Sequence, residues 1–212
     1  MGIRDRLTTI QGNLDLLKRG AIDDPELRQE ALSEIETETK RMTRMVGDLL
    51  LLAQADAGHA LHRVPVELDT LLLDVFRQGL VMAQGKVELR LVHEDQAQIM
   101  GDVDRLRQLL LNLVDNAIKY TPAGGKVTLG LYREPGHVRI EVADNGPGIA
   151  DKDLPHIFER FYRADRARSR QLGGSGPGLP LVQWVAQAPD GEMRVQSGVG
   201  VRHHLTTRLP LE

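Results

Sequence analysis

Hydrophobic residues recur at helical spacing through the first fifty residues of the chain. From Ile3, the first seam recurs every three or four residues at Leu7, Ile10, Leu14 and Leu17. Gly20 is expected to end this helix, and Asp24-Pro25 supplies an N-cap and a first-turn proline for a second helix. The second seam comprises Leu27, Ala31, Ile35, Met42, Met45, Leu49 and Leu52, with the polar Glu38 as an interruption. The pattern predicts an antiparallel helical hairpin over residues 1–58.

Such a hairpin presents more apolar surface than two helices can cover between themselves. Self-association of two copies into a four-helix bundle would bury this surface, which predicts a homodimer through the N-terminal helices. The alternative is that the hairpin packs only on the globular remainder of its own chain.

Beyond residue 58 the pattern changes, and residues 59–212 are expected to form a second domain. A short linker around 57–59 leads into 64–67, a helix is expected over 68–82, and Asp102 is a plausible N-cap for another helix. Strands are expected near 87–92, 98–100, 126–132, 137–143, 192–197 and 203–209. The chain is therefore predicted to be α+β: a helical hairpin followed by an α/β sandwich, whose mixed sheet carries helices on one face.

Composition narrows the classes of function. The 30 acidic and 27 basic residues nearly balance, so no polyanion-binding field and no nucleic-acid partner are expected. The absence of cysteine excludes a disulfide framework, a thiol nucleophile and a thiolate metal site. Without a bilayer-length apolar run or a signal-peptide core, we expect a cytoplasmic protein, joined to a membrane only through segments upstream of this chain.

Three polar residues after Asp102 are candidates for a site that binds a metal ion and a nucleotide. Asn112, Asn116 and Lys119 are spaced i, i+4, i+7, so they share one stripe of a helix while apolar residues fall on a different face. Mg²⁺ takes hard oxygen ligands and usually keeps several waters, so one or two amide oxygens suffice to hold it. Two amide oxygens and an ammonium on one ridge suit a metal ion that bridges the phosphates of a nucleotide.

Two glycine-containing segments extend this interpretation. Asp144 ends an expected strand, where its carboxylate could accept a hydrogen bond from the exocyclic amine of a base. Gly146 and Gly148 would allow a tight turn and a close approach of the backbone to the ring, although this pair alone fits a plain turn equally well. Further on, the loop 173–179 precedes an apolar helix, where backbone N–H groups and the positive helix end favour phosphate.

Together these motifs resemble the ATP-binding domain of sensor histidine kinases. That domain belongs to the superfamily shared with gyrase, the heat-shock chaperone ATPases and the mismatch-repair ATPases. The resemblance rests on the order of four motifs along the chain. They are an asparagine-containing segment (Asn112–Pro122), an Asp-x-Gly-x-Gly motif (Asp144–Gly148), the segment Phe158–Arg163 and a Gly-x-Gly-x-Gly-Leu loop (Gly174–Leu179). The segment Leu7–Leu17 also resembles the dimerisation helix of these kinases, so the similarity spans nearly the whole chain.

The resemblance implies a site for ATP and Mg²⁺. Asn116 would hold the metal with Asn112 beside it, and Lys119 would contact phosphate. Tyr120 would lie near the base or ribose, although core packing is an equal alternative for this side chain. Asp144 would read the adenine amino group, which favours ATP over GTP.

The resemblance also implies a pocket with a lid. The residues expected to shape them are Gly146, Gly148, Ile149, Gly174, Gly176, Gly178 and Leu179. Arg160 or Arg163 could reach the terminal phosphates, and a solvated helix face is the alternative for both. Pro177 and Pro180 replace a leucine and an alanine of the family's glycine loop, and Pro177 would stiffen a segment expected to fold over ATP.

Family members phosphorylate a histidine and pass the phosphoryl group to an aspartate on the receiver domain of a response regulator. In this chain Met1 stands at the position of the accepting histidine, Gly2 at that of its acidic neighbour, and Arg6 at that of a proline. A thioether cannot be phosphorylated, so autophosphorylation at this position is not expected. Two interpretations stay open: a kinase core cut at this residue, or a degenerate, non-catalytic dimeric module that binds ATP and regulates a partner.

Overall fold

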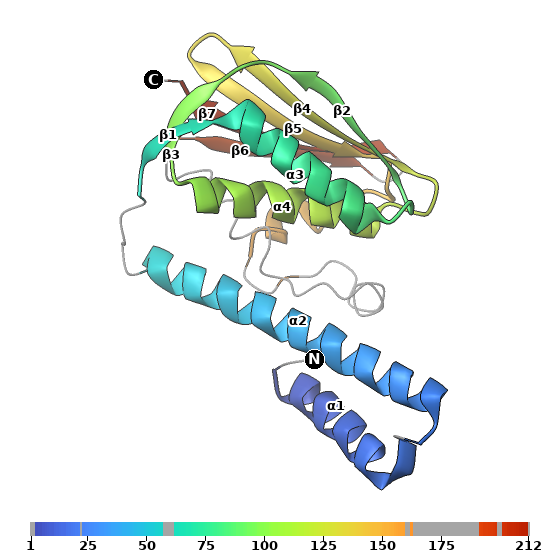
Figure 1. The fold of residues 1–212 in the computed structure, drawn as a ribbon. Coiled ribbons are helices and arrows are strands. Elements are labelled where there is room, and N and C mark those ends of the chain that lie inside the picture. The colour runs from blue at the N-terminus through green and yellow to red at the C-terminus, as the bar shows by residue number, and fades with distance from the viewer. Residues whose placement is uncertain are drawn as a thin grey trace. The chain divides into compact units, whose positions relative to one another are not determined.

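The computed structural model of the chain describes residues 3–21, 23–56, 62–159, 162, 191–198 and 201–211. Two units, Met1–Ala53 and Gln54–Glu212, each hold their own internal contacts (Figure 1). The predicted domain boundary after residue 58 falls in the stretch 57–61, outside the described residues.

The first unit is a helical hairpin. Its elements are α1 (Ile3–Leu16), the π-helical turn η1 (Leu17–Ala21) and α2 (Pro25–Asp56). Asp24 caps α2 as predicted, because its Oδ1 accepts the backbone N–H groups of Glu26 and Leu27 at 2.9 and 3.1 Å. The first helix differs from the prediction at its end: regular α winding stops at Leu16, and a π turn continues through Gly20.

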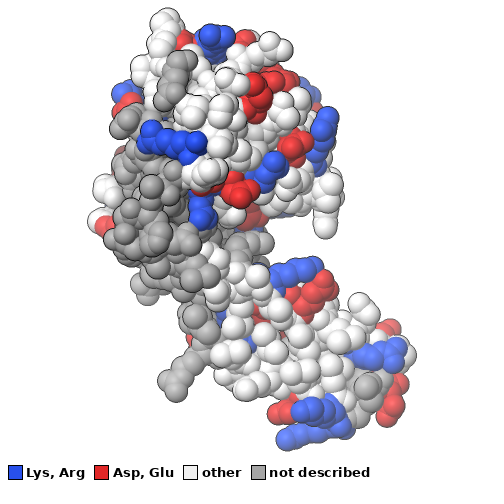
Figure 2. All heavy atoms as spheres, turned by 60° about the vertical axis from the view of Figure 1, so that its left-hand side comes forward, with Lys and Arg blue, Asp and Glu red and all other residues white. Residues whose placement is uncertain are grey.

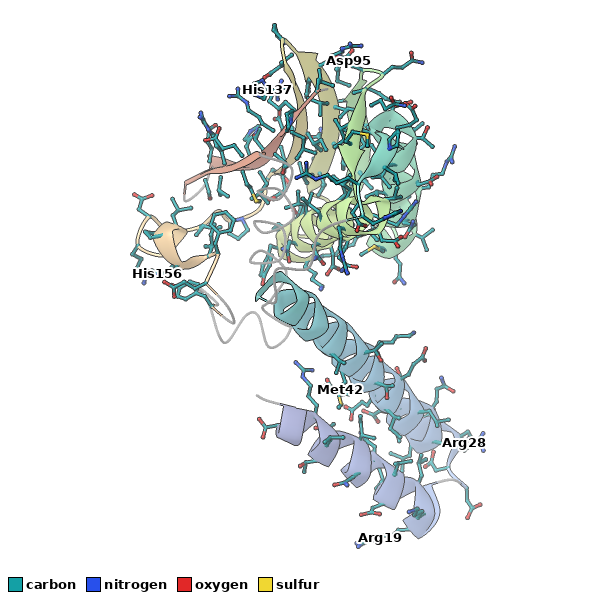
Figure 3. The ribbon with its side chains drawn as sticks, turned by 90° about the vertical axis from the view of Figure 1, so that its left-hand side faces the viewer. Arg19, Arg28, Met42, Asp95, His137 and His156 are labelled. Atoms are coloured by element: carbon teal, nitrogen blue, oxygen red, sulfur yellow. The ribbon has the colours of Figure 1, made fainter. Side chains whose placement is uncertain are left out.

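The predicted seam of the hairpin is only partly buried. Ala31 is buried, and Ile35 and Met42 are half-buried on the same helix. Figure 3 shows Met42 on the side of α2 that faces α1. Among the side chains of the unit that the structure describes, six large apolar ones remain between 42% and 47% exposed: Leu7, Leu14, Leu16, Leu27, Leu32 and Val46.

A buried ion pair joins the two helices of the hairpin. Arg6 Nη1 lies 2.5 Å from Glu38 Oε2, and the two side chains are only 6% and 7% exposed. Glu38 is the polar residue that interrupts the second apolar seam. Its buried carboxylate is neutralised by Arg6 on the facing helix.

The second unit is built on a five-stranded sheet in the order β2-β4-β5-β7-β6, with α3 and α4 on one face (Figure 1). The strands are β2 (Glu88–Glu94), β4 (Lys126–Glu134), β5 (His137–Asp144), β6 (Glu192–Gly198) and β7 (Val201–Pro210). The β2–β4 pair is parallel and the other pairs are antiparallel. This mixed sheet with helices on one face confirms the predicted α+β architecture.

Two helices contact the sheet through apolar side chains. They are α3 (Leu68–Ala83) and α4 (Val103–Tyr120). Large side chains that are almost completely buried in this unit include Leu68, Leu72, Leu109, Leu110, Leu113, Leu129, Leu131, Ile140 and Leu209. Asp102 caps α4 as predicted, because its Oδ1 accepts the N–H of Arg105 at 3.2 Å.

A second, small sheet was not predicted. Strand β1 (Val64–Glu67) pairs antiparallel with β3 (Gln98–Gly101), in a stretch expected to follow directly from a linker. Pro65 cannot donate a ladder hydrogen bond, and a strand with a single neighbour tolerates this because one of its edges is free. The backbone N–H of Leu68 then donates to the carbonyl of Ala97 at 2.8 Å, which fixes the start of α3 beside this ribbon.

Candidate nucleotide site

Helix α4 carries the asparagine stripe along the edge of its buried face. Asn112 is 9% exposed, more deeply placed than a stripe facing an open cleft would be, while Asn116 is half-buried. Asn112 Oδ1 accepts a hydrogen bond from Gln108 Nε2 at 3.4 Å, but its Nδ2 is buried and has no partner in the described structure. A buried donor without a partner is destabilising by about 1–3 kcal/mol, so this amide marks a place where a ligand or water would complete the site.

The ammonium of Lys119 is held within α4 itself. It forms an ion pair with Asp115, one turn earlier on the same helix. The predicted contact of Lys119 with phosphate stays a prediction, and it would require this side chain to exchange or share its carboxylate partner.

Asp144 ends β5 beside the C-terminal end of α4. Its side chain is 7% exposed, and Oδ1 accepts the backbone N–H of Gly146 at 2.8 Å. A β-carbon on Gly146 would lie 2.7 Å from that oxygen and 3.2 Å from the carbonyl oxygen of Tyr120. The missing side chain at position 146 therefore allows the ends of β5 and α4 to approach each other.

The turn after Asp144 is hydrogen-bonded to β6, which is an edge strand of the sheet. Gly148 has φ of +81°, in the left-handed region that favours glycine. The backbone N–H of Ile149 then donates to Ser197 Oγ on β6 at 2.8 Å. Predicted pocket residues 146, 148 and 149 therefore form one segment that runs from the end of β5 to β6.

A short 3₁₀ turn, η2 (Leu154–His156), follows this segment. Tyr162 Oη donates to Asp153 Oδ1 at 2.6 Å, and this hydrogen bond raises the pKa of the Tyr162 phenol. The rings of His156 and Tyr162 lie 5.3 Å apart, and His156 Nδ1 lies 2.6 Å from Glu159 Oε1 (Figure 3). These contacts anchor Tyr162 to the turn that precedes it.

The remaining predicted site residues cannot be placed. Arg160, Arg163, Gly174, Gly176, Gly178 and Leu179 all lie outside the described residues, as does the proposed lid that contains Pro177.

Two polar residues near the site were missed by the sequence analysis. Lys86 Nζ donates to the carbonyl oxygens of Ile118 and Lys119 at 2.8 and 3.0 Å. Asn145 Oδ1 accepts the backbone N–H of Lys126 at 2.7 Å. Both contacts join segments far apart in the sequence. The local signal was limited to the preference of asparagine for turns, and no local pattern indicated the contact of Lys86.

Neither sign of charge dominates the face of the molecule shown in Figure 2. Figure 2 shows acidic and basic side chains interspersed on the face in view. Among the residues that the structure describes, no group of three histidine, cysteine, aspartate or glutamate side chains is placed to hold a metal ion. The same residues include no helix long and apolar enough to cross a membrane. Metal binding at this site would therefore depend on amide oxygens and on the ligands that a nucleotide brings.

Comparison with protein families identifies two matches. Residues 101–212 match the histidine kinase-, DNA gyrase B-, and HSP90-like ATPase family, and residues 3–58 match the His kinase A (phospho-acceptor) domain. A protein of Mycobacterium tuberculosis named "Probable sensor histidine kinase TcrY" is 40% identical over 210 residues, 99% of this chain and 44% of that protein. Sensor histidine kinase WalK of Bacillus subtilis is 34% identical over 212 residues, 98% of this chain and 35% of that protein. The chain thus spans less than half the length of these two relatives.

Two solved structures are also similar to this chain. Full-length ShkA in complex with AMPPNP superposes with a TM-score of 0.74 at 31% identity, over 88% of this chain and 39% of that one. Histidine kinase AdeS of Acinetobacter baumannii gives a TM-score of 0.73 over 99% of this chain and 97% of that one; its 24% identity supports the fold alone.

Proposed function

This chain belongs to the sensor histidine kinases of the histidine kinase-, DNA gyrase B-, and HSP90-like ATPase family, and we propose that its candidate site binds ATP with Mg²⁺ for phosphoryl transfer to a histidine. The phosphoryl group would then pass to an aspartate on a response-regulator receiver domain. Since the chain covers only part of its relatives, both the acceptor and the regulator are parts of this proposal.

The observation that carries the proposal is the placement of Asp144. Its carboxylate is nearly buried at the end of a central strand, and one oxygen is already engaged by the N–H of Gly146. A fixed, poorly solvated acceptor of this kind suits an exocyclic amine of a purine, since a hydrogen bond gains strength where water is excluded. Gly146 leaves room for close approach, and Tyr120 ends the neighbouring helix.

The asparagine stripe fits a metal-bound triphosphate. Asn116 supplies an amide oxygen, the type of donor that Mg²⁺ accepts, and within the described part of the chain its carboxamide makes no hydrogen bond. The unpartnered Nδ2 of Asn112 supplies a donor for an anionic oxygen. When bound, MgATP supplies the phosphoryl group and the positive charge of the metal. The residues of the chain bind and orient it, which is the main contribution of the protein in phosphoryl transfer.

The hairpin supports a homodimer as part of this proposal. In the single chain, six large apolar side chains of the first unit stay between 42% and 47% exposed. A second hairpin packed against the first would remove this area from water, at about 25 cal/mol per Å² of apolar surface. The predicted four-helix bundle is one arrangement that would do so.

Calorimetric titration of the chain with ATP, in the presence and absence of Mg²⁺, tests the site. We expect Asn116→Ala and Asp144→Ala each to weaken ATP binding by about tenfold to a hundredfold, the equivalent of one lost hydrogen bond to a charged group. Asn13→Ala and Asp151→Ala, on α1 and on the exposed turn after Ile149, are the matched controls. Unchanged affinity in both site variants would contradict the assignment.

Incubation with labelled ATP tests the activity. The chain is mixed with a hairpin from a homologous kinase that carries the acceptor histidine, because Met1 occupies that position here. Label on the added hairpin would support phosphoryl transfer by this chain. The second candidate is a nucleotide-binding module without catalysis, and it would be supported by ATP binding with no transfer of label.

A further inference from the structure

Lys86 holds the C-terminal end of α4 from outside the helix. It follows the turn between α3 and β2, where Gln84 and Gly85 have φ of 46° and 75°. Its ammonium donates to the carbonyl oxygens of Ile118 and Lys119 at 2.8 and 3.0 Å. Carbonyls in the last turn of a helix have no intrahelical partner, and a cation there also meets the negative end of the helix dipole.

The backbone around Lys86 also fixes the loop that follows α4. The N–H of Gly124 donates to the carbonyl of Lys86 at 2.8 Å, and the N–H of Glu88 donates to the carbonyl of Gly125 at 2.8 Å. The side chain of Lys86 therefore binds the end of α4, and its backbone carbonyl binds the loop 121–125 that connects α4 to β4.

This connection in turn contacts the segment that carries Asp144. A β-carbon on Gly125 would lie 2.8 Å from Asn145 Oδ1, the atom that accepts the N–H of Lys126 at 2.7 Å. On the other side, the carbonyl oxygen of Tyr120 would lie 3.2 Å from a β-carbon on Gly146. A shift at the end of α4 or in its loop would therefore change the position of the Asp144–Gly146 segment, because close-packed atoms transmit such a displacement to their neighbours.

We propose that Lys86 is a positioning residue for the purine end of the nucleotide site. It acts through α4 and the loop 121–125, setting the distance between the asparagine stripe and the Asp144 carboxylate. This inference rests on the proposed function for its effect on ATP, but its effect on the geometry is independent of any ligand. The contrasting role is a helix cap that stabilises the fold and leaves the pocket unchanged.

Three variants separate these roles. Lys86→Met removes the charge and the donors with little loss of volume, and Lys86→Arg keeps a cationic donor. Lys126→Met is the matched control, because this lysine follows the same loop, its side chain is 56% exposed, and its ammonium lies 3.8 Å from Glu88 Oε2. The measurements are the free energy of unfolding, the ATP dissociation constant and the amide chemical shift of Gly146, which reports its hydrogen bond to Asp144.

For Lys86→Met we expect ATP affinity to fall about tenfold, the effect of losing hydrogen bonds from a charged donor. In transfer to the added hairpin, KM for ATP should rise by a larger factor than kcat at saturating ATP falls, since Lys86 contacts the last turn of α4 and not the turns that carry Asn112 and Asn116. The Gly146 amide should shift in the absence of nucleotide, and Lys86→Arg should restore affinity to within about twofold of the original. Lys126→Met should alter none of these values.

A Lys86→Met chain that is destabilised but keeps its ATP affinity and its Gly146 shift would overturn the inference and leave a simple helix cap. If this variant does not fold, a Lys86→Arg chain that folds but fails to match the original ATP affinity and Gly146 shift would overturn it as well. An original chain that binds no ATP would instead refute the proposed function, and the Gly146 shift would still decide whether Lys86 positions the segment.

Discussion

Arg6 and Glu38 form an ion pair inside the hairpin, and each stands where the expected pattern calls for a different residue. The resemblance to the kinases implies a proline at the position of Arg6, and Glu38 interrupts the apolar seam of α2. Their charged atoms lie 2.5 Å apart, with both side chains nearly buried. The two departures therefore compensate each other.

Breaking this pair should destabilise the hairpin strongly. Glu38→Ala leaves the Arg6 guanidinium buried and without its carboxylate, so we expect the free energy of unfolding to fall by about 3–5 kcal/mol. Replacing both residues by leucine should be neutral or stabilising, because apolar packing then continues through this layer. Urea denaturation followed by the helical circular dichroism signal measures both, and a double variant as unstable as the single one would contradict the explanation.

Gly146→Ala should impair the nucleotide site without unfolding the chain. The new β-carbon would lie 2.7 Å from Asp144 Oδ1, so the carboxylate or the turn must shift. Overpacking of this kind destabilises by about 1–3 kcal/mol, and ATP affinity should fall by about tenfold or more. The control is Gly47→Ala on α2, where an added β-carbon meets nothing within 4 Å. This control should leave ATP affinity unchanged, and equal affinities in both variants would argue against a steric role for Gly146.

Asp95 should make the stability of the second unit sensitive to acid. The backbone N–H of Arg133 donates to Asp95 Oδ2 at 2.8 Å, and His93 Nε2 lies 3.1 Å from Oδ1. These contacts, the backbone hydrogen bond first, hold the pKa of the carboxyl below its usual value. Because the folded state favours the ionised form, the stabilisation is present above about pH 4, the usual pKa, and is lost as pH falls through the lowered value.

Comparison with Asp95→Asn isolates this contribution. The difference in urea midpoint between the original chain and the variant should be constant near neutral pH and should shrink below about pH 4. Asp95 directly follows β2, an edge strand of the five-stranded sheet, and lies within the second unit, so the effect belongs to that unit. A difference independent of pH would contradict the assigned cause.

Ligand linkage should stabilise the second unit. A ligand that binds only the folded state at a hundred times its dissociation constant stabilises it by about 2.7 kcal/mol. Addition of MgATP should therefore raise the melting temperature, and chelation of Mg²⁺ should reverse most of the increase. Asn116→Ala should show little difference between ATP with and without Mg²⁺, because its amide oxygen is the proposed metal ligand.

Local signals in the sequence predicted most of the fold. The N-caps at Asp24 and Asp102 could be predicted because each aspartate oxygen accepts a hydrogen bond from a backbone N–H no more than three residues further along the chain. Apolar and polar residues alternate along the strands of the five-stranded sheet, so the position of each strand in the sequence could be predicted. Strand β1 was missed because Pro65 reads as a break, and pairing with β3 depends on a contact across thirty residues.

The site was only partly predictable for a similar reason. Asn112, Asn116, Asp144 and Gly146 belong to motifs whose spacing is visible in the chain. Lys86 acts on carbonyls more than thirty residues away, and no periodicity indicates such a contact. The near-complete burial of Asn112 also depends on tertiary packing, which the helical stripe alone does not give.

The order of strands in the sheet has a consequence for synthesis on the ribosome. Strand β7 lies between β5 and β6, although it is the last of the three to be translated. Until residues 201–210 leave the exit tunnel, β6 has no neighbour in this sheet, and β5 exposes the edge that ends at Asp144. A nascent chain that has passed every nucleotide-binding motif would therefore still be unable to close its sheet, and in that interval it would be most exposed to pairing with other chains.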